Sequence, residues 1–325
     1  MREIIISDNE ANQRLDKFLC KYMDQAPTGF FYKMLRKKNI VLNGRKAKGS
    51  EKLAAGDSVK LFLSDETIGK FTGEKTAGLP AESGYTPEIV YEDDHVLLLN
   101  KPAGILSQKA KVSDISMTEH VIGYLLRSGQ LTREELQTFR PGICNRLDRN
   151  TSGLIAAGKS LAGLQELSRG FRERIFRKYY RCLAAGRIEE SVRMTGYLKK
   201  DREDNYVTVS ARPSEDAGLI ETEYRPVASG SRVTLLEVHL ITGKTHQIRA
   251  HLASVGHPII GDYKYGNRKI NEWYQARYGL SAQLLHSYRL EFPQMEGALE
   301  GLSGRVFTAE EPEQFRKIQK SLLGI

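Results

Sequence analysis

Residues 144–160 read CNRLDRNTSGLIAAGKS, a polar stretch that leads directly into an apolar one. The charged and amide side chains of residues 145–150 are typical of a turn, whereas GLIAAGK (153–159) is typical of a buried strand. A hydrophobic core does not require charges and sharp turns at this point. We therefore interpret the turn as a candidate functional loop beside a central strand.

Strand-like runs occur on both sides of this stretch and follow one another closely. They lie at EIVYE (88–92), HVLLLNK (95–101), RKYYRCLAAG (177–186) and RVTLLEVHLI (232–241). Helical spacing of apolar residues is found near 117–127, 161–173 and 245–254. Because the strands lack regular intervening helices, the pattern favours an α+β domain with a largely antiparallel mixed sheet flanked by helices over a doubly wound parallel sheet.

The N-terminal part of the chain is basic. Residues 13–60 hold 12 Lys and Arg against 4 Asp and Glu, which is +8 of the formal net charge of +9. Apolar spacing predicts two helices and then strands, at 14–23, 28–38, 40–47 (IVLNGRKA, turning at Asn43-Gly44) and 58–63 (SVKLFL). Such a concentration of charge indicates a small domain that binds a polyanion such as nucleic acid.

Length and composition predict two domains. A chain of 325 residues with 40% hydrophobic and 27% charged residues can form two globular units. From residue 65 the composition shifts to Gly, Ser, Thr, Glu and Pro with little periodicity, which is typical of a flexible linker. We expect an N-terminal domain at 1–64 (core 13–60), a linker at 65–86 and a larger domain at 87–325.

Several function classes find no support in the sequence. No run of 18 apolar residues is present, and the apolar stretch near the N-terminus is too short for a signal peptide, which predicts a cytoplasmic protein without a membrane partner. Cys20, Cys144 and Cys182 are widely spaced and odd in number, so we expect neither a disulfide framework nor a zinc site. The histidines near residue 250 lack a His-Glu-x-x-His pattern, and we expect no metal.

Three further stretches combine polar side chains with turns: NKPAG (100–104), KYYRCL (178–183) and TGKTHQIR (242–249). In order and spacing they resemble, together with CNRLDRNTSGL (144–154), the RluA family of pseudouridine synthases. Members of this family often carry an N-terminal S4 RNA-binding domain and modify ribosomal or transfer RNA. The resemblance covers nearly the whole chain, and its most specific pieces are RLDRNTSGL (146–154) and TGKTHQIRAHLASVGHPIIGDYKYG (242–266). The basic segment, with Arg14-Leu15-Asp16 and Val41-Leu42-Asn43-Gly44, resembles the S4 domain itself.

The resemblance implies roles for individual residues. Asp148 would be the catalytic aspartate, Tyr180 the active-site tyrosine of the family's Lys-x-Tyr segment, and Arg249 the basic residue that pairs with the aspartate. Arg146 would enter the RNA stack when the target uridine is flipped out. No residue is implied as a metal ligand, and the family's reaction implies no cofactor.

Further RNA contacts are expected from basic and polar side chains of both domains. They are Arg14, Lys17, Lys33, Arg36, Lys37, Lys38, Arg45, Lys46, Lys101, Thr245, His246 and Gln247. For Lys101, a structural role stays open beside a phosphate contact. The chain departs from the family pattern at Asn145, where many members have His, and at Lys244, where many have Arg. The first departure leaves the contacts around the loop open.

The chemistry of uridine isomerisation accounts for these residue types. The reaction breaks the bond between N1 and C1′, turns the uracil and joins C5 to C1′, so substrate and product are isomers. An ionised carboxylate is the minimum requirement, and it could add to the base, attack the sugar or assist proton removal. A guanidinium beside it stabilises its charge, and a tyrosine ring can stack on the extruded base.

Competing interpretations remain for several of these residues. Asp148 fits a turn-capping aspartate, and Tyr179 competes with Tyr180 because adjacent residues of a strand point to opposite faces. Residues 153–160 match the spacing of a P-loop triphosphatase, although polar residues precede them and apolar ones fill the loop positions. A non-catalytic RNA-binding protein on the ribosome is a third interpretation. We favour a cytoplasmic, monomeric pseudouridine synthase of large-subunit ribosomal RNA, free or in a pre-ribosomal particle, over one that acts on transfer RNA.

Overall fold

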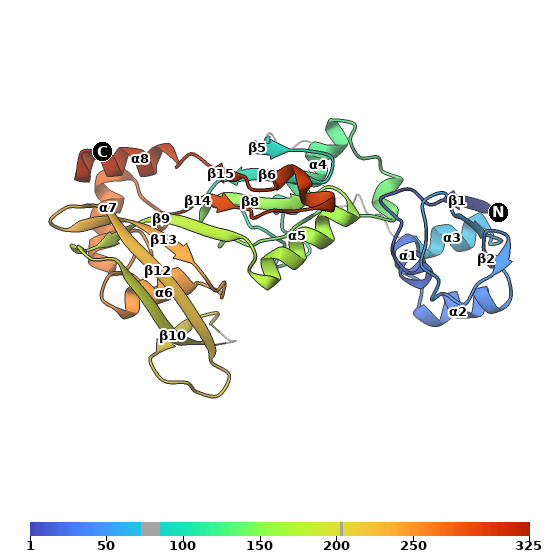
Figure 1. The fold of residues 1–325 in the computed structure, drawn as a ribbon, viewed down its shortest axis with the longest axis horizontal. Helices are drawn as coiled ribbons and strands as arrows, with labels where there is room; N and C mark the ends of the chain where they lie inside the picture. Colours follow the sequence, from blue (N-terminus) through green and yellow to red (C-terminus); the bar gives the residue numbers. More distant parts are fainter. Residues whose placement is uncertain (73–84, 202–203) are drawn as a thin grey trace.

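The computed structural model describes residues 1–72, 85–201 and 204–325. Its elements form two groups, and Figure 1 shows the N-terminal group, in blue, at one end of an elongated arrangement. The N-terminal group contains β1 (Arg2–Ile5), α1 (Leu15–Tyr22), α2 (Thr28–Arg36), β2 (Ile40–Leu42), β3 (Arg45–Lys46), β4 (Ser58–Leu61) and α3 (Asp65–Phe71).

The larger group combines one extended sheet with helices on its faces. Its strands are β5 (Glu88–Glu92), β6 (Val96–Lys101), β7 (Gly142–Ile143), β8 (Ser152–Gly158), β9 (Arg177–Ala185), β10 (Val192–Lys200), β11 (Val207–Ser210), β12 (Gly218–Ser229), β13 (Val233–Leu240), β14 (Leu285–Glu291) and β15 (Val306–Thr308). Its helices are α4 (Met117–Arg127), η1 (Glu135–Gln137), α5 (Leu161–Glu173), α6 (Gln247–Ser254), α7 (Arg268–Tyr278), η2 (Gly297–Leu302) and α8 (Glu313–Leu323).

The helices and strands predicted for the basic N-terminal segment are confirmed. α1 and α2 turn Leu15, Phe18 and Leu35 inward, where each is at most 1% exposed. The strands form an antiparallel sheet in the order β1-β4-β2-β3. Asn43 and Gly44 have φ of 49° and 72°, so the hairpin between β2 and β3 turns through two left-handed residues, which an Asn-Gly pair favours.

The first seven residues of the segment predicted to be a linker form a helix instead. Residues 65–71 form α3, whose Ile68 is 2% exposed in the N-terminal core. The ring of Phe71 packs on that of Phe30, with centroids 4.8 Å apart. These apolar contacts tie the helix to the N-terminal group, and a shift in composition could not reveal them. The predicted linker's residues 73–84 lie outside the described residues.

The strands of the larger group form one 11-stranded sheet. Its main path is β11-β10-β12-β13-β9-β14-β8-β6-β5, with β15 beside β14 and β7 beside β8. Paired strands are antiparallel except for β14 and β8, which run parallel. The prediction of a largely antiparallel mixed sheet is therefore confirmed.

Helices cover both faces of this sheet because its strands alternate apolar side chains between the faces. Leu97 and Leu99 of β6 pack against α4, whereas Val96 and Leu98 pack against α5 and η2. Toward the other end of the sheet, α6 covers one face of β9 and β13, and α7 and α8 cover the other. No helix in the described ranges is long and apolar enough to cross a membrane.

The conformation of β8 contradicts the P-loop interpretation. Ser152–Gly158 is a fully buried strand, and the ammonium of Lys159 pairs with the carboxylate of Glu92 at 2.7 Å rather than pointing into a phosphate loop. Gly153 has a φ of 110°, and a Cβ there would overlap the backbone of Ser287 in β14. Glycine therefore allows the close approach of β8 and β14 that closes the sheet beside the loop of residues 144–151.

Candidate active site

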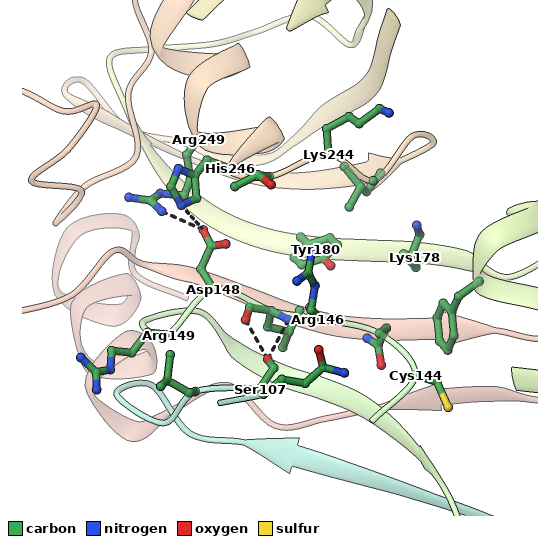
Figure 2. Close-up of a pocket in the computed structure, with 18 of the residues that line it drawn as sticks. Ser107, Cys144, Arg146, Asp148, Arg149, Lys178, Tyr180, Lys244, His246 and Arg249 are labelled. Atoms are coloured by element: carbon green, nitrogen blue, oxygen red, sulfur yellow. Dashed lines mark hydrogen bonds and ion pairs between the residues drawn. The ribbon is translucent and has the colours of Figure 1, made fainter. Parts of the chain in front are cut away.

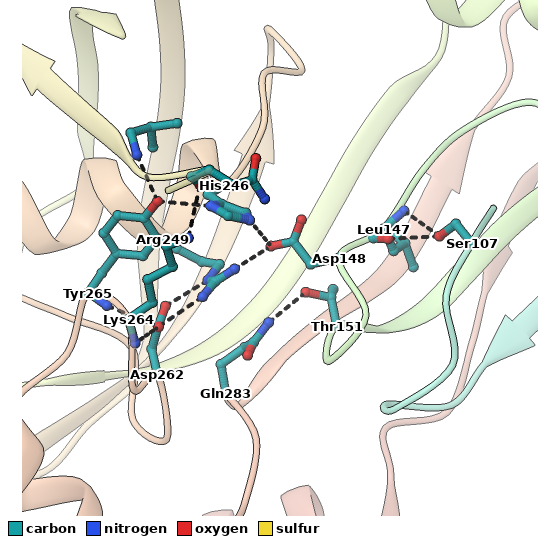
Figure 3. Close-up of polar contacts among 12 residues, drawn as sticks. Ser107, Leu147, Asp148, Thr151, His246, Arg249, Asp262, Lys264, Tyr265 and Gln283 are labelled. Atoms are coloured by element: carbon teal, nitrogen blue, oxygen red, sulfur yellow. Dashed lines mark hydrogen bonds and ion pairs between the residues drawn. The ribbon is translucent and has the colours of Figure 1, made fainter. Parts of the chain in front are cut away.

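The loop before β8 brings Asp148 against the first turn of α6. Nη1 of Arg249, 101 residues away in the chain, lies 2.7 Å from Oδ2 of Asp148. The rest of the guanidinium binds both oxygens of Asp262, at 2.7 Å from Nε and 3.0 Å from Nη2 (Figure 3). Arg249 is 8% exposed and Asp262 1%, whereas the side chain of Asp148 is 26% exposed. The structure thus contains the expected ion pair and a second carboxylate that the sequence did not suggest.

The surroundings of Arg249 fix its charge and its orientation. Burial acts to lower its pKa, but hydrogen bonds and charge from Asp262 and Asp148 outweigh burial and raise the pKa above its ordinary value. The guanidinium therefore stays protonated and stabilises negative charge on Asp148. Its two bonds to Asp262 hold its plane so that Nη1 points at the loop that carries Asp148.

The loop that carries Asp148 is held on both sides by backbone hydrogen bonds. Oγ of Ser107 donates to the carbonyl oxygen of Leu147 at 2.7 Å and accepts from the N–H of the same residue at 3.0 Å. The carbonyl oxygen of Arg149 accepts from Nζ of Lys101 at 3.0 Å. Because its two neighbours in the chain are fixed, the carboxylate of Asp148, which pairs with Arg249, does not have to anchor the loop.

Asn145, the departure from the family pattern, joins the same loop to β8. Its Oδ1 accepts from the N–H of Ala156 at 2.7 Å, and its Nδ2 donates to the carbonyl oxygen of Leu154 at 3.3 Å. An amide suits this position because it supplies both an acceptor and a donor. In this chain, therefore, the side chain of Asn145 holds the loop against β8.

His246 approaches Asp148 from the side of α6. Its Nε2 lies 4.0 Å from Oδ2 of Asp148, and its Nδ1 lies 2.8 Å from the hydroxyl of Tyr265. That hydroxyl also accepts a hydrogen bond from the N–H of Val207 at 3.1 Å. Burial lowers the pKa of His246 although Asp148 opposes the shift, so the imidazole is neutral at pH 7. The guanidinium is therefore the cation that faces the carboxylate from α6.

Three residues expected to contact RNA lie differently from the prediction. α6 begins at Gln247 rather than at 245, because His246 has a left-handed φ of 52°; Thr245 lies in the preceding loop, where it still lines the cavity. Gln247 is 2% exposed, and its amide binds β12 and Thr242. Lys101 is 0% exposed, and its Nζ donates to three backbone carbonyls. Both side chains are buried and hydrogen-bonded within the protein, which argues against an RNA contact by Gln247 and favours the structural role that was left open for Lys101.

The two adjacent tyrosines of β9 face opposite sides of the sheet. Tyr180 lines the same cavity as Asp148. Tyr179 points away and stacks on the ring of His239, with centroids 4.7 Å apart, and under the guanidinium of Arg289 at 3.9 Å. Burial raises the pKa of Tyr180 to about 12. The phenol therefore keeps its proton at neutral pH, and the ring packs in the core cluster at the edge of the cavity.

These side chains surround a cavity of about 840 Å³, which Figure 2 shows in close-up. Among the described residues, its lining has Asp148 as the single carboxylate and nine cations: Lys109, Arg146, Arg149, Arg172, Arg174, Lys178, Lys200, Lys244 and Arg249. The volume suits a nucleotide-sized group, and the excess of cations suits an anionic ligand. Arg146 is exposed, so its side chain can reach a ligand that covers the cavity.

Sequence reasoning missed Ser107, Asp262 and Tyr265. Asp262 and Tyr265 lie in the stretch GDYKYG, which the family resemblance includes, but nothing local indicates what a polar side chain in such a turn will bind. Ser107 is a single hydroxyl in a loop 40 residues before its partner Leu147. Within the described ranges, no group of three or more His, Cys, Asp or Glu is placed to hold a metal ion.

Replacing Lys101 with methionine is expected to lower the free energy of unfolding by about 2–4 kcal/mol, because three carbonyls lose a buried donor. Burial lowers the pKa of Lys101 to about 7 against an unfolded value near 10.5. Between these values only the unfolded state binds the proton, and the folded lysine is an amine that keeps two of its three N–H donors, so the wild type should gain stability over the variant as pH rises, by roughly 1 kcal/mol per pH unit.

Denaturant unfolding of both proteins between pH 6.5 and 9.5 measures this difference. Parallel pH profiles would show that Lys101 keeps its proton in the folded chain.

Comparisons with known proteins agree with this geometry. A family model described as RNA pseudouridylate synthase matches residues 95–254. The "Ribosomal large subunit pseudouridine synthase C" of Vibrio vulnificus (strain CMCP6) is 32% identical and covers 98% of this chain and 95% of its own length. The protein of the same name from Escherichia coli (strain K12) is 30% identical over 89% of this chain and 88% of its own length.

The fold is shared with solved structures as well. The structure titled "Human RNA Pseudouridylate Synthase Domain Containing 4" superposes with a TM-score of 0.57 at 22% identity, covering 71% of this chain and 91% of that one. At that identity the superposition shows the fold alone, whereas the full-length similarity to the bacterial proteins extends over both groups of elements. The chain therefore belongs to the RluA family of pseudouridine synthases, isomerases that act on RNA.

Proposed function

We propose that this chain converts uridine to pseudouridine in large-subunit ribosomal RNA, with Asp148 as the acting carboxylate. The observation that carries the proposal is the single carboxylate in a cavity lined by nine cations, held against a guanidinium that is itself fixed by a buried aspartate. The choice of ribosomal RNA is supported by the names of the bacterial relatives, which are similar along nearly their whole length.

Each side chain of the site then has a task in the isomerisation. The negative charge of Asp148 is stabilised by Arg249, so the carboxylate is ready to add to the base, attack C1′ or assist proton removal. Tyr180 supplies a ring on which the extruded uracil stacks, and its protonated phenol favours this role over that of a base in the resting enzyme. Arg146, exposed at the cavity mouth, takes the place of the flipped uridine in the RNA stack.

We also propose that residues 1–72 form an S4 domain that holds the structured RNA. Support comes from the order of elements, two helices followed by a small basic sheet, and from the exposure of Lys17, Lys33, Arg36, Lys37, Lys38, Arg45 and Lys46. Arg14 differs from these, because it spans 2.7 Å to the carboxylate of Asp16, which also accepts from Tyr32. Its first task is therefore to hold the start of α1.

The experiment that tests the function maps pseudouridine in RNA from cells with and without this gene. Carbodiimide adducts on pseudouridine stop reverse transcriptase, and we expect one or more stops in large-subunit ribosomal RNA to disappear with the gene. A gene encoding Asp148→Asn should fail to restore them. Loss of stops in transfer RNA alone would overturn the substrate class, and unchanged stops in all RNA would overturn the function.

The salt dependence of RNA affinity tests whether the basic surface of residues 1–72 binds the RNA. Replacing Lys37, Lys38 and Lys46 with glutamine should lower the slope of log affinity against log salt by about 2, since each lost phosphate contact removes roughly 0.7 to 0.9. The matched control replaces Lys269, Lys317 and Lys320, exposed lysines of α7 and α8, and removes the same charge. Equal slopes for the two triple variants would show that net charge, rather than this surface, determines binding.

A further inference from the structure

Three cations that line the active-site cavity have no carboxylate partner among the described residues. Arg174 follows α5, Lys178 lies in β9 and Lys244 lies in the loop between β13 and α6, and all three line the cavity. Among the described residues, none of the three has an Asp or Glu oxygen within 4.0 Å, whereas Arg177 and Arg181, on the opposite face of β9, pair with glutamates at 4.0 Å and 3.0 Å. Within the described ranges, therefore, the arginines on one face of β9 pair with glutamates and the lysine on the other face does not.

Lys178 lies near the proposed base site and beside the loop that carries Lys244, whose own ammonium lies next to Gly218, 3.5 Å from where a Cβ on that glycine would be. Lys178 precedes Tyr180 by two residues, so both side chains leave β9 on the cavity face, about 7 Å apart along the strand. A Cβ on Gly243 would lie 3.3 Å from Nζ of Lys178, which places this ammonium beside the loop of Lys244. In Figure 2, Lys178 points from β9 toward the side of the cavity on which Lys244 lies.

This arrangement is unfavourable without an anion. Burial lowers the pKa of Lys178, and the charge of Arg174 lowers it further. Holding like charges around a partly desolvated ammonium costs free energy that a bound anion would recover. The described residues supply no carboxylate there, so an anionic ligand in the cavity would be a favourable partner, and a phosphate can accept hydrogen bonds from ammonium and guanidinium groups.

We propose that Arg174, Lys178 and Lys244 form a phosphate subsite for the RNA backbone next to the target uridine. The inference rests on the proposed function and deepens it: the base lies on Tyr180 beside Asp148, and a phosphate of the same strand lies one step further along β9. The subsite is separate from the basic surface of residues 1–72. It positions the target strand within the catalytic cavity, whereas that surface holds the RNA from a distance.

The test compares Lys178→Gln and Lys244→Gln with Lys199→Gln in the full-length protein. Lys199 is an exposed lysine of β10 that does not line the cavity, so it is the matched control. The probe is a labelled transcript around a uridine identified by the carbodiimide mapping, and filter binding gives its Kd between 50 and 300 mM salt. Each cavity variant should weaken binding about fivefold to tenfold and lower the salt slope by roughly 0.7 to 0.9, while Lys199→Gln changes neither.

Two further measurements separate the possible explanations. The single-turnover rate at saturating enzyme should stay within about threefold of the wild type for both cavity variants, because the subsite binds ground state and transition state alike. Inorganic phosphate should compete with the transcript more strongly than chloride at equal ionic strength, and this difference should shrink in Lys178→Gln.

Unchanged salt slopes in both variants, or a lost rate with unchanged Kd, would overturn the subsite while the function stands. A wild-type protein that forms no pseudouridine in the transcript would overturn the function itself.

Discussion

Asp148→Asn is expected to lower the single-turnover rate of pseudouridine formation by about 10⁴-fold or more, a loss of roughly 5.5 kcal/mol of transition-state stabilisation. The amide keeps the shape of the carboxylate, and its oxygen can still accept from Nη1 of Arg249, now at 2.7 Å from Oδ2. It carries no negative charge, however, and is neither a useful nucleophile nor a base toward the sugar or the uracil. The rate should therefore fall whichever of the three routes the reaction takes.

Folding and RNA binding of this variant should stay close to those of the wild type. The loop is held through the backbone of Leu147 and Arg149, and the side chain of Asp148 is 26% exposed, so its replacement leaves no buried group unpaired. Asp114→Asn is a suitable control, because that carboxylate lies in a loop near the cavity and accepts only from two backbone N–H groups. A turnover above a tenth of the wild-type rate in Asp148→Asn would remove Asp148 from the chemistry.

The helices that were predicted correctly include two whose first turns are capped by side chains close in the sequence. The expected helices at 117–127 and 161–173 coincide with α4 and α5. Ser116 and Glu119 form a capping box at the first, and Ser160 accepts from the N–H of Gly163 at the second. Such caps act within one turn of the chain, so they can be recognised in the sequence without knowledge of the fold.

Elements that depend on distant contacts were harder to predict. α3 is stable because Ile68 and Phe71 reach the N-terminal core, and neither residue stands out in a polar segment. β12 contains Pro226, which argues against a central strand, but its pairing with β13 shifts register between Pro226 and Ala228 and so accommodates the missing N–H. In both cases tertiary packing decides against the local preference.

The site shows the same division between local and distant information. The motif positions and the strand periodicity indicated Asp148, Arg249 and the choice between Tyr179 and Tyr180. The contacts of Asp262 could not be predicted, because its carboxylate binds the guanidinium of Arg249, which only the folded chain places beside it. The structural role of Lys101 could not be chosen from the sequence for a related reason. A lysine beside a turn is usually exposed, and the three carbonyls that bind this one converge only in the folded chain.

Arg249→Leu is expected to lower turnover by about 10³-fold and the free energy of unfolding by about 3–5 kcal/mol. The first effect follows from the loss of the cation that stabilises Asp148, at 2.7 Å. The second follows from Asp262, whose side chain is 0% exposed and would keep only the N–H groups of Lys264 and Tyr265 as partners. Because both effects arise from one substitution, a loss of activity alone would not distinguish catalysis from folding.

The double variant Arg249→Leu with Asp262→Asn separates the two effects. The amide at position 262 can still accept from the N–H groups of Lys264 and Tyr265, and it removes the unpaired buried charge, so most of the lost stability should return. The turnover should remain as low as in the single variant, because the guanidinium that pairs with Asp148 is missing from both proteins. Arg249→Lys should fall between wild type and Arg249→Leu, since one ammonium cannot bind both carboxylates with the planar fork of a guanidinium. Denaturant unfolding and single-turnover rates of the three variants decide the matter: a double variant that regains turnover together with stability would show that Arg249 supports the fold and takes no part in the reaction.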